Sequence, residues 1–200
     1  MTARPVTGVV LAAGSSRRLG TPKQLLPYRQ MTVLGATLDA ARAAGFDQLI
    51  VTLGGAAEAV RDAVRMDDED VVTVDDYGTG CSASLRVALE RVDPQAAGIV
   101  LMLGDQPHVA PATMRRMIAA GPGAPDNAVM VCRYADGIGH PFWFSRDVFG
   151  ELSQLHGDKG VWKLVQSVRY PVREITVAGP VPLDVDTWDD YQRLVESVPS

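Results

Sequence analysis

Short apolar runs alternate along the chain with segments in which apolar residues recur at helical spacing. The apolar runs predict β-strands at 6–13, 48–53, 71–74, 99–103, 128–134, 142–144 and 173–177. The helical spacing predicts helices at 34–44, 57–64, 81–92, 111–118, 148–155, 162–168 and 188–195. Strands and helices that alternate in this way indicate an α/β fold, with a mostly parallel sheet covered by helices on both faces.

The same pattern also suggests where individual elements lie. The run 99–103 is the most apolar, so we expect it at the centre of the sheet. Gly45 is placed to end the first long helix. Pro182 interrupts an extended segment at 181–186, which we therefore expect at an edge of the sheet. The length of 200 residues suits one medium α/β domain, and we interpret residues 1–200 as a single domain.

Composition argues against several classes of protein. The net charge of −5, with acidic and basic residues interspersed, is not that of a nucleic-acid-binding protein, which usually carries a basic excess. No apolar stretch reaches the roughly 18 residues of a membrane-spanning helix, and the N-terminal residues show no signal peptide. Cys81 and Cys132 lie far apart and form no redox or metal motif. We therefore expect a reduced, cytoplasmic protein that binds neither nucleic acid nor membrane.

The first apolar run ends in a loop suited to hold an anion. Residues 9–23 read Val-Val-Leu-Ala-Ala-Gly-Ser-Ser-Arg-Arg-Leu-Gly-Thr-Pro-Lys. Small residues let backbone N–H groups approach a ligand, and Gly14 and Gly20 can adopt positive φ without steric cost. Successive N–H groups turned inward form a nest for an anion, to which Arg18 and Lys23 add positive charge. Two residues separate Gly20 from Lys23, so the loop is not a Walker A motif. It predicts a phosphate-binding loop, the alternative being a glycine-rich turn that serves packing.

Three aspartates supply the chemistry that a phosphate-binding loop needs. Asp105 follows the central run, and ligands bind beyond the carboxyl ends of such strands in open α/β sheets. Asp184 and Asp186 precede the last helix. Magnesium is held by one or two carboxylates together with substrate phosphates. We therefore predict a Mg²⁺ site at Asp105, Asp184 and Asp186. The alternative is that Asp105 caps a turn and that the other two simply begin a helix.

Several segments spread over nearly the whole chain carry a family resemblance. They are Leu-Ala-Ala-Gly-Ser-Ser-Arg-Arg-Leu-Gly-Thr-Pro-Lys at 11–23, Gln-Leu-Leu-Pro at 24–27, Gly-Asp-Gln-Pro at 104–107, Gly-His-Pro at 139–141, Gly-Asp-Lys-Gly at 157–160 and Asp-Val-Asp-Thr at 184–187. Together they closely resemble the MobA-like nucleotidyltransferases, and most of all the branch with molybdenum cofactor cytidylyltransferase. Ala13 and Pro22 depart from the guanylyl branch of that family, which favours CTP over GTP.

The resemblance implies both a fold and an activity. The fold is a single Rossmann-like, three-layer α/β/α domain. The activity is transfer of CMP from CTP to the phosphate of a molybdopterin-type acceptor, with Mg²⁺ as cofactor and release of pyrophosphate. A transient contact with a molybdoenzyme or its chaperone follows from that role. Two alternatives stay open: a transferase that uses GTP or another NTP with a different phosphorylated acceptor, and a non-catalytic nucleotide-binding accessory protein.

The resemblance also implies roles for individual residues. Nucleotide-binding positions are Leu11, Ala12, Ala13, Gly14, Ser16, Arg18, Lys23, Gly80, Ser82, Ser84 and Asp105. Among them, Arg18 and Lys23 are the expected catalytic residues, because they stabilise the charge that grows on the triphosphate. His140 and Asp158 are expected to face the acceptor. Trp162 is interpreted as a core or rim residue rather than as a stacking surface.

Overall fold

The computed structural model describes residues 4–76, 80–123, 127–157, 159–167 and 169–197. One sheet dominates it, with the strand order β5-β4-β1-β6-β8-β7-β9. The strands are β1 (Val6–Ala12), β4 (Gln48–Leu53), β5 (Asp70–Thr73), β6 (Gly98–Leu103), β7 (Val129–Arg133), β8 (Ile138–Ser145) and β9 (Val172–Thr176). Only β8 pairs antiparallel with its neighbours in this sheet, so the predicted mostly parallel sheet is confirmed. β6 lies fourth in the order, at the expected centre.

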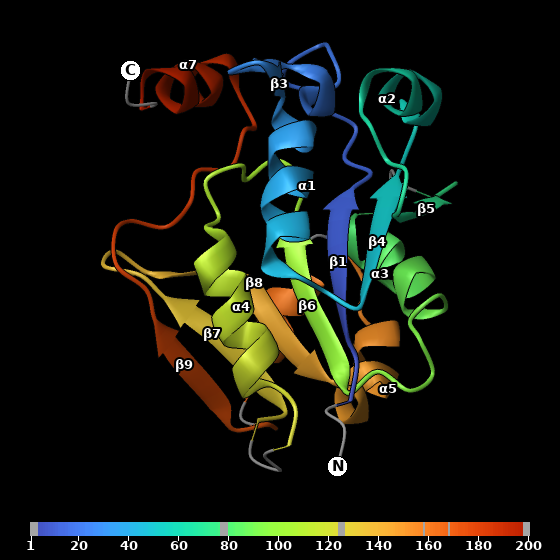
Figure 1. Ribbon diagram of the computed structural model, residues 1–200, viewed down its shortest axis with the longest axis vertical. Helices are drawn as coiled ribbons and strands as arrows, with labels where there is room; N and C mark the ends of the chain where they lie inside the picture. The colour runs from blue at the N-terminus through green and yellow to red at the C-terminus, as the bar shows by residue number, and fades with distance from the viewer. Residues whose placement is uncertain (1–3, 77–79, 124–126, 158, 168, 198–200) are drawn as a thin grey trace.

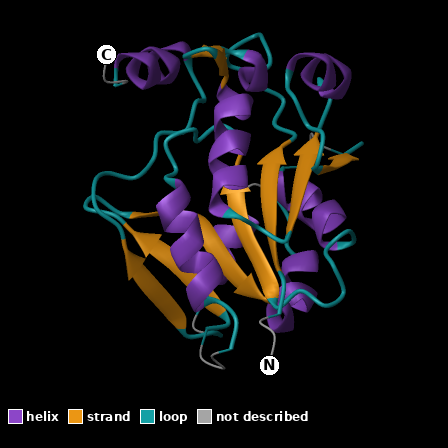
Figure 2. Ribbon diagram, viewed as in Figure 1, coloured by secondary structure: helices purple, strands orange, loops and turns teal. Residues whose placement is uncertain are grey.

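Helices cover both faces of the sheet (Figures 1 and 2). They are α1 (Val33–Ala44), α2 (Ala57–Ala63), α3 (Cys81–Leu89), α4 (Pro111–Ala120), α5 (Phe149–Ser153), α6 (Gly160–Val165) and α7 (Trp188–Glu196), with 3-10 turns η1 (Lys23–Leu25) and η3 (Arg146–Val148). α1, α2 and α4 contribute to the core on one face, and α3, α5 and α6 to the core on the other. The predicted α/β/α layering is therefore confirmed. No helix among the described residues is long and apolar enough to cross a membrane.

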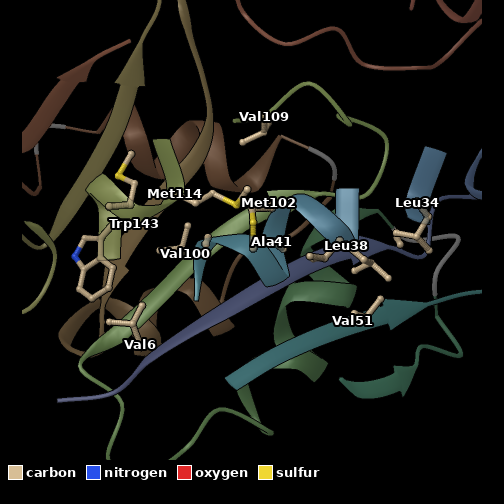
Figure 3. Packing of buried hydrophobic residues seen from close by; sticks show 14 of the residues in the cluster. Val6, Leu34, Leu38, Ala41, Val51, Val100, Met102, Val109, Met114 and Trp143 are labelled. Atoms are coloured by element: carbon tan, nitrogen blue, oxygen red, sulfur yellow. The ribbon is translucent and has the colours of Figure 1, made fainter. Parts of the chain in front are cut away.

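The two cores follow from the alternation of side chains along each strand. Every residue of β1 is buried, because helices cover the sheet on both sides. Val6 and Val10 join the core under α1 and α4, whereas Val9 and Leu11 join the core under α3. Figure 3 shows the first of these cores, with side chains of α1 meeting those of the strands. The continuous apolar run of β1 therefore supplies buried side chains to the helical layers on both faces of the sheet.

A short β-hairpin and the C-terminal helix lie beyond the carboxyl ends of the parallel strands, at the top of Figure 1. The hairpin of β2 (Pro27–Tyr28) and β3 (Met31–Thr32) packs there with α7 around Leu26, Val33 and Leu194. Thr32 caps α1 by accepting a hydrogen bond from the backbone N–H of Gly35, at 3.0 Å. This arrangement brings the C-terminal segment back over the start of the chain.

Two local predictions prove wrong. Residues 181–186 form no strand; they cross the top of the sheet as an irregular segment, in which Pro182 lacks the N–H that a ladder would need. Residues 138–141, which read as a loop that precedes the apolar run 142–144, belong to β8, because β7 pairs with Ile138 and Gly139 past an irregularity at Val131/Cys132. In the loop after β1, Gly20 and Ser16 adopt positive φ, at +69° and +49°, and Gly14 does not.

Candidate active site

The site lies where β1 and β6 end side by side. β1 runs into the loop 13–22, and β6 runs into Gly104 and Asp105. A Cβ at Gly104 would lie 2.8 Å from that of Ala12, so only glycine lets the two strand ends approach this closely. The pocket above them has a volume of about 690 Å³. Its lining comes from the loop after β1, the start of α3, the end of β6, the start of α6 and the segment before α7.

Hydrogen bonds within the loop after β1 set its shape. The carbonyl of Ser16 accepts from the backbone N–H groups of Leu19 at 3.0 Å and Gly20 at 3.2 Å. The hydroxyl of Ser16 accepts from the backbone N–H of Lys23 at 2.9 Å. Ser16 and Gly20 both have positive φ, which turns the chain tightly between the strand and η1. The predicted role of glycine here is thus shared with a serine whose side chain supports the turn.

The side chain of Gln24 is hydrogen-bonded to the start of this loop. Its side chain is 4% exposed, and its amide donates to the carbonyls of Ala12 at 2.6 Å and Gly14 at 3.2 Å. The motif at 24–27 marked this residue as part of the resemblance, but nothing in the sequence indicated that it turns back on the loop. Gln24 therefore satisfies these two carbonyl oxygens at the start of the loop.

Opposite charges meet at the mouth of the loop. Nζ of Lys23 contacts the carboxylate of Asp105 and lies 2.9 Å from Oδ1 of Asp186. The guanidinium of Arg18 lies 2.8 Å from Oδ2 of the same Asp186. Burial lowers the pKa of Lys23, but the charge and hydrogen bond of Asp105, assisted by Asp186, outweigh it and raise that pKa above the usual value. Lys23 is therefore a fixed cation in this site.

The two aspartates before α7 differ in their electrostatics. Burial raises the pKa of Asp186, but the hydrogen bonds and charges of Lys23 and Arg18 outweigh it and hold that pKa below its usual value. Asp184 is exposed toward the pocket, yet the protein around its carboxyl group and the charge of Asp105 raise its pKa to about 6. Asp184 lacks a cation of its own at hydrogen-bonding distance among the described residues.

Gln106 connects Asp184 to the end of β6. Its amide Nε2 donates to Oδ1 of Asp184 at 2.6 Å and to the carbonyl of Pro182 at 3.4 Å. Gln106 is 2% exposed; its bond to Pro182 is buried, and its bond to Asp184 is partly buried. The irregular segment that carries Asp184 is thereby fastened to the strand end that carries Asp105.

The carboxylates fit a cation that brings its own further ligands. Among the described residues no group of three or more acidic, histidine or cysteine side chains forms a ready-made metal cage. Asp105, Asp184 and Asp186 nevertheless line one pocket, and the charges of Asp105 and Asp186 raise the pKa of Asp184. Magnesium is usually held by one or two carboxylates with waters and substrate phosphates, and not by an all-protein cage. The donor set therefore fits that mode of binding.

Most of the residues expected in the site line this pocket. Those that do are Leu11, Ala12, Ala13, Gly14, Ser16, Arg18, Lys23, Gly80, Ser84, Asp105, Asp184 and Asp186. Ser82 is not among the lining residues; its hydroxyl donates to the carbonyl of Gly157 at 2.6 Å and so ties α3 to the loop before α6. Asp158 lies outside the described residues.

His140 lies behind the pocket wall. It is 7% exposed, and it stacks on Phe142 with ring centroids 4.2 Å apart. The edge of Trp162, which does line the pocket, meets His140 at a centroid distance of 6.3 Å. Burial lowers the pKa of His140 to about 4, so the ring is neutral at neutral pH. Its assignment to the acceptor stays a prediction.

Other residues line the pocket without having been singled out for it. Lys159 and Trp162 do so at the start of α6, and Arg17 and Gln24 do so near the loop after β1. The motif at 157–160 could have drawn attention to Lys159, a cation that follows a glycine-rich turn. No pattern in the sequence indicated that Trp162 lines the pocket, because a tryptophan at helical spacing is as typical of a hydrophobic core as of a binding site.

Comparison with known proteins agrees with this geometry. Residues 8–173 match the model of the MobA-like NTP transferase domain. The crystal structure of Rv0371c from Mycobacterium tuberculosis H37Rv is 74% identical, with a TM-score of 0.93 over 98% of this chain and 100% of that one. The structure of the complex of Rv0371C with manganese is 70% identical, with a TM-score of 0.88 over 97% and 100% of the two chains.

More distant relatives also match along most of their length. A nucleotidyl transferase from Methanothermobacter thermautotroptrophicus is 28% identical, with a TM-score of 0.80 over 96% of both chains. Nicotine blue oxidoreductase from Paenarthrobacter nicotinovorans is 28% identical over 197 residues, which are 95% of this chain and 96% of that protein. The family match spans well over half of the chain, and the sheet has the expected Rossmann-like architecture. The chain therefore belongs to the MobA-like NTP transferase family and is a nucleotidyltransferase.

Proposed function

We propose that this nucleotidyltransferase moves CMP from CTP to the phosphate of a molybdopterin-type acceptor and releases pyrophosphate. The observation that carries the proposal is the meeting of Lys23 and Arg18 with Asp105 and Asp186 at one strand end. Two cations supply charge for a triphosphate, and the carboxylates supply charge for a divalent cation. This combination suits a nucleotide that arrives with its metal.

The loop after β1 supplies the triphosphate subsite in this proposal. Its small residues leave room for a phosphate, and Lys23 lies at its inner end as a partly buried, permanently charged group. Lys23 then stabilises the negative charge that grows as the bond between the α- and β-phosphates breaks. Arg18, which is exposed, contacts the outer phosphates.

The acceptor needs little chemical activation. An oxygen of its phosphate group attacks the α-phosphorus of CTP, and the oxygen that bridges to the β-phosphate leaves with pyrophosphate. A phosphate monoester is already ionised at neutral pH, so no side chain has to remove a proton. Catalysis then consists of placing the two phosphates in line and neutralising their charge. His140 and Asp158 stay the proposed acceptor residues, and Lys159 and Trp162, which line the pocket at the start of α6, are available beside them.

We propose Mg²⁺ as the metal, held by Asp105 together with Asp184 and Asp186. A bound divalent cation polarises the phosphates and neutralises charge on the leaving pyrophosphate. The manganese in the complex of a relative that is 70% identical supports a divalent cation in this family member as well. The three carboxylates of the pocket support the same assignment.

The test is a direct assay of the product. The purified chain is incubated with Mg²⁺, purified molybdopterin and one of the four NTPs, and the products are identified by mass. The proposal expects a cytidylylated acceptor and pyrophosphate with CTP only. A product with another NTP, or with a sugar phosphate in place of molybdopterin, would favour the alternative transferase. Tight CTP binding without any Mg²⁺-dependent pyrophosphate release would overturn the proposal in favour of an accessory protein.

A further inference from the structure

We propose that Gln106 is a positioning residue that holds Asp184 in place to receive the divalent cation. The inference rests on the proposed function, because it concerns the metal of that site. Gln106 follows Asp105 in the chain, but its side chain is hydrogen-bonded to Pro182 and Asp184 rather than to Lys23 or the loop after β1 among the described residues. Its role is therefore exerted through Asp184.

The geometry fixes both ends of this contact. Nε2 of Gln106 lies 2.6 Å from Oδ1 of Asp184 and 3.4 Å from the carbonyl oxygen of Pro182. Both partners are acceptors, so the amide must present its nitrogen to them. Asp184 lies in an irregular segment that gains no support from strand pairing. The bond from Gln106 supplies that support, across 78 positions of the chain.

A second link joins the same two segments, and it is of a different kind. Lys23 bridges Asp105 and Asp186 with a positive charge. A divalent cation competes with that charge for the same carboxylates, so the Lys23 bridge loosens when the metal binds. The amide of Gln106 is neutral and does not compete. It can therefore keep Asp184 in place in the metal-bound state.

Fold stability alone does not account for a glutamine at this position. Oε1 of Gln106 is buried and has no hydrogen-bond partner among the described residues. A buried polar atom without a partner destabilises a fold, and an apolar side chain of the same shape avoids that penalty. Methionine would avoid this unpaired oxygen but would give up the two hydrogen bonds of the amide nitrogen, so what the glutamine adds at this position is its hold on Pro182 and Asp184.

The experiment compares Gln106→Met with Gln48→Met, which makes the same chemical change at the start of β4, the opposite end of the sheet. Manganese is titrated into each protein, without nucleotide or acceptor, and free Mn²⁺ is followed by electron paramagnetic resonance. We expect Gln106→Met to weaken Mn²⁺ binding by about tenfold or more, the scale for residues that orient metal ligands. Gln48→Met should leave the affinity unchanged. The thermal midpoint of each variant is measured as well, so that Mn²⁺ affinity is compared between folded proteins.

A variant of Asp184 separates positioning from a general effect. In the Asp184→Ala protein the addition of Gln106→Met should have no further effect on Mn²⁺ affinity, because the side chain that Gln106 acts through is gone. Unchanged affinity in Gln106→Met, an equal loss in the Asp184→Ala background, or no Mn²⁺ binding by the unmodified protein would each overturn the inference. The titration contains neither CTP nor molybdopterin, so a wrong assignment of those substrates would not alter its outcome.

Discussion

Lys23 and Asp186 are separated by 163 positions in the chain, yet Nζ of the first lies 2.9 Å from Oδ1 of the second. The contact closes the site between the loop after β1 and the segment before α7. Asp105 joins Lys23 from the end of β6, so three distant segments share one cation. Removing such a cluster of charges from water costs free energy. A bound metal ion can replace Lys23 as the partner of the carboxylates, and a bound phosphate can replace the carboxylates as the partner of Lys23. The relationship therefore predicts what happens when each charge is removed.

Replacing Lys23 should slow the reaction far more than it weakens folding. Lys23→Ala removes the cation that we propose beside the α-phosphate, and we expect turnover to fall by about 10²–10³, the scale for loss of one such group. Steady-state pyrophosphate release under saturating CTP measures it. Lys163→Ala, the same change at an exposed position of α6, serves as control and should keep normal turnover. Turnover near that of the unmodified enzyme in Lys23→Ala would contradict the assigned role.

Removing the metal should abolish activity reversibly. Without a divalent cation, Lys23 and Arg18 remain paired with Asp186, and the charge of the triphosphate is left largely uncompensated. We expect EDTA to stop pyrophosphate release, and excess Mg²⁺ or Mn²⁺ to restore it. Asp105→Asn should need a higher Mg²⁺ concentration for half-maximal activity, because a neutral amide is a weaker ligand than a carboxylate. Full activity after chelation would argue against a metal-dependent transfer.

The carboxyl ends of β1 and β6 could be predicted from the sequence, because the apolar runs and the residues that follow them are local features. A fully apolar run such as that of β1 requires cover on both faces, and the carboxyl ends of neighbouring parallel strands must meet. This reasoning brings Asp105 next to the loop of Lys23. It does not extend to Gln24 and Gln106, whose amides turn toward segments that only the tertiary fold brings near. Long-range hydrogen bonds of this kind leave no periodic signal.

The same limit explains the elements that were wrong. Residues 138–141 look like a loop, because glycine, histidine and proline are poor strand formers. Pairing of Gly139 with Cys132 nevertheless continues the strand, so tertiary contacts outweigh local preference there. Residues 181–186 look like an edge strand, but Gln106 holds them over the pocket instead. In both places the competing interaction comes from a segment far away in the chain.

Replacing Gly20 by alanine should destabilise the folded chain because of the backbone conformation at this position alone. Its φ is +69°, and an added Cβ would meet no atom within 4 Å. An L-residue in this left-handed region costs about 1–2 kcal/mol, so Gly20→Ala should lower the free energy of unfolding by roughly that amount. Gly150→Ala is the matched control: the position is helical, has open space and lacks positive φ, so stability should rise by about 0.5 kcal/mol. Urea denaturation measures both, and equal effects at the two positions would contradict the explanation.

His140 should make stability depend on pH below neutrality. Burial lowers the pKa of His140 to about 4 in the folded chain, from an ordinary value of 6.5. Between these values the unfolded chain binds the proton and the folded chain does not, so stability falls as pH decreases through this window. Above the ordinary pKa both forms are neutral and the effect disappears. The full difference amounts to roughly 3 kcal/mol.

Replacing the histidine isolates this contribution from that of the carboxylates. Phenylalanine at position 140 keeps an aromatic ring against Phe142 and Trp162 but cannot take up a proton. The free energy of unfolding of His140→Phe should therefore decline less steeply between pH 7 and pH 4.5 than that of the unmodified chain, whatever the two values at pH 7. Urea denaturation across this range measures both slopes. Parallel slopes would mean that His140 is protonated equally in the folded and unfolded chains, and that its ring is not shielded as the packing around Trp162 requires.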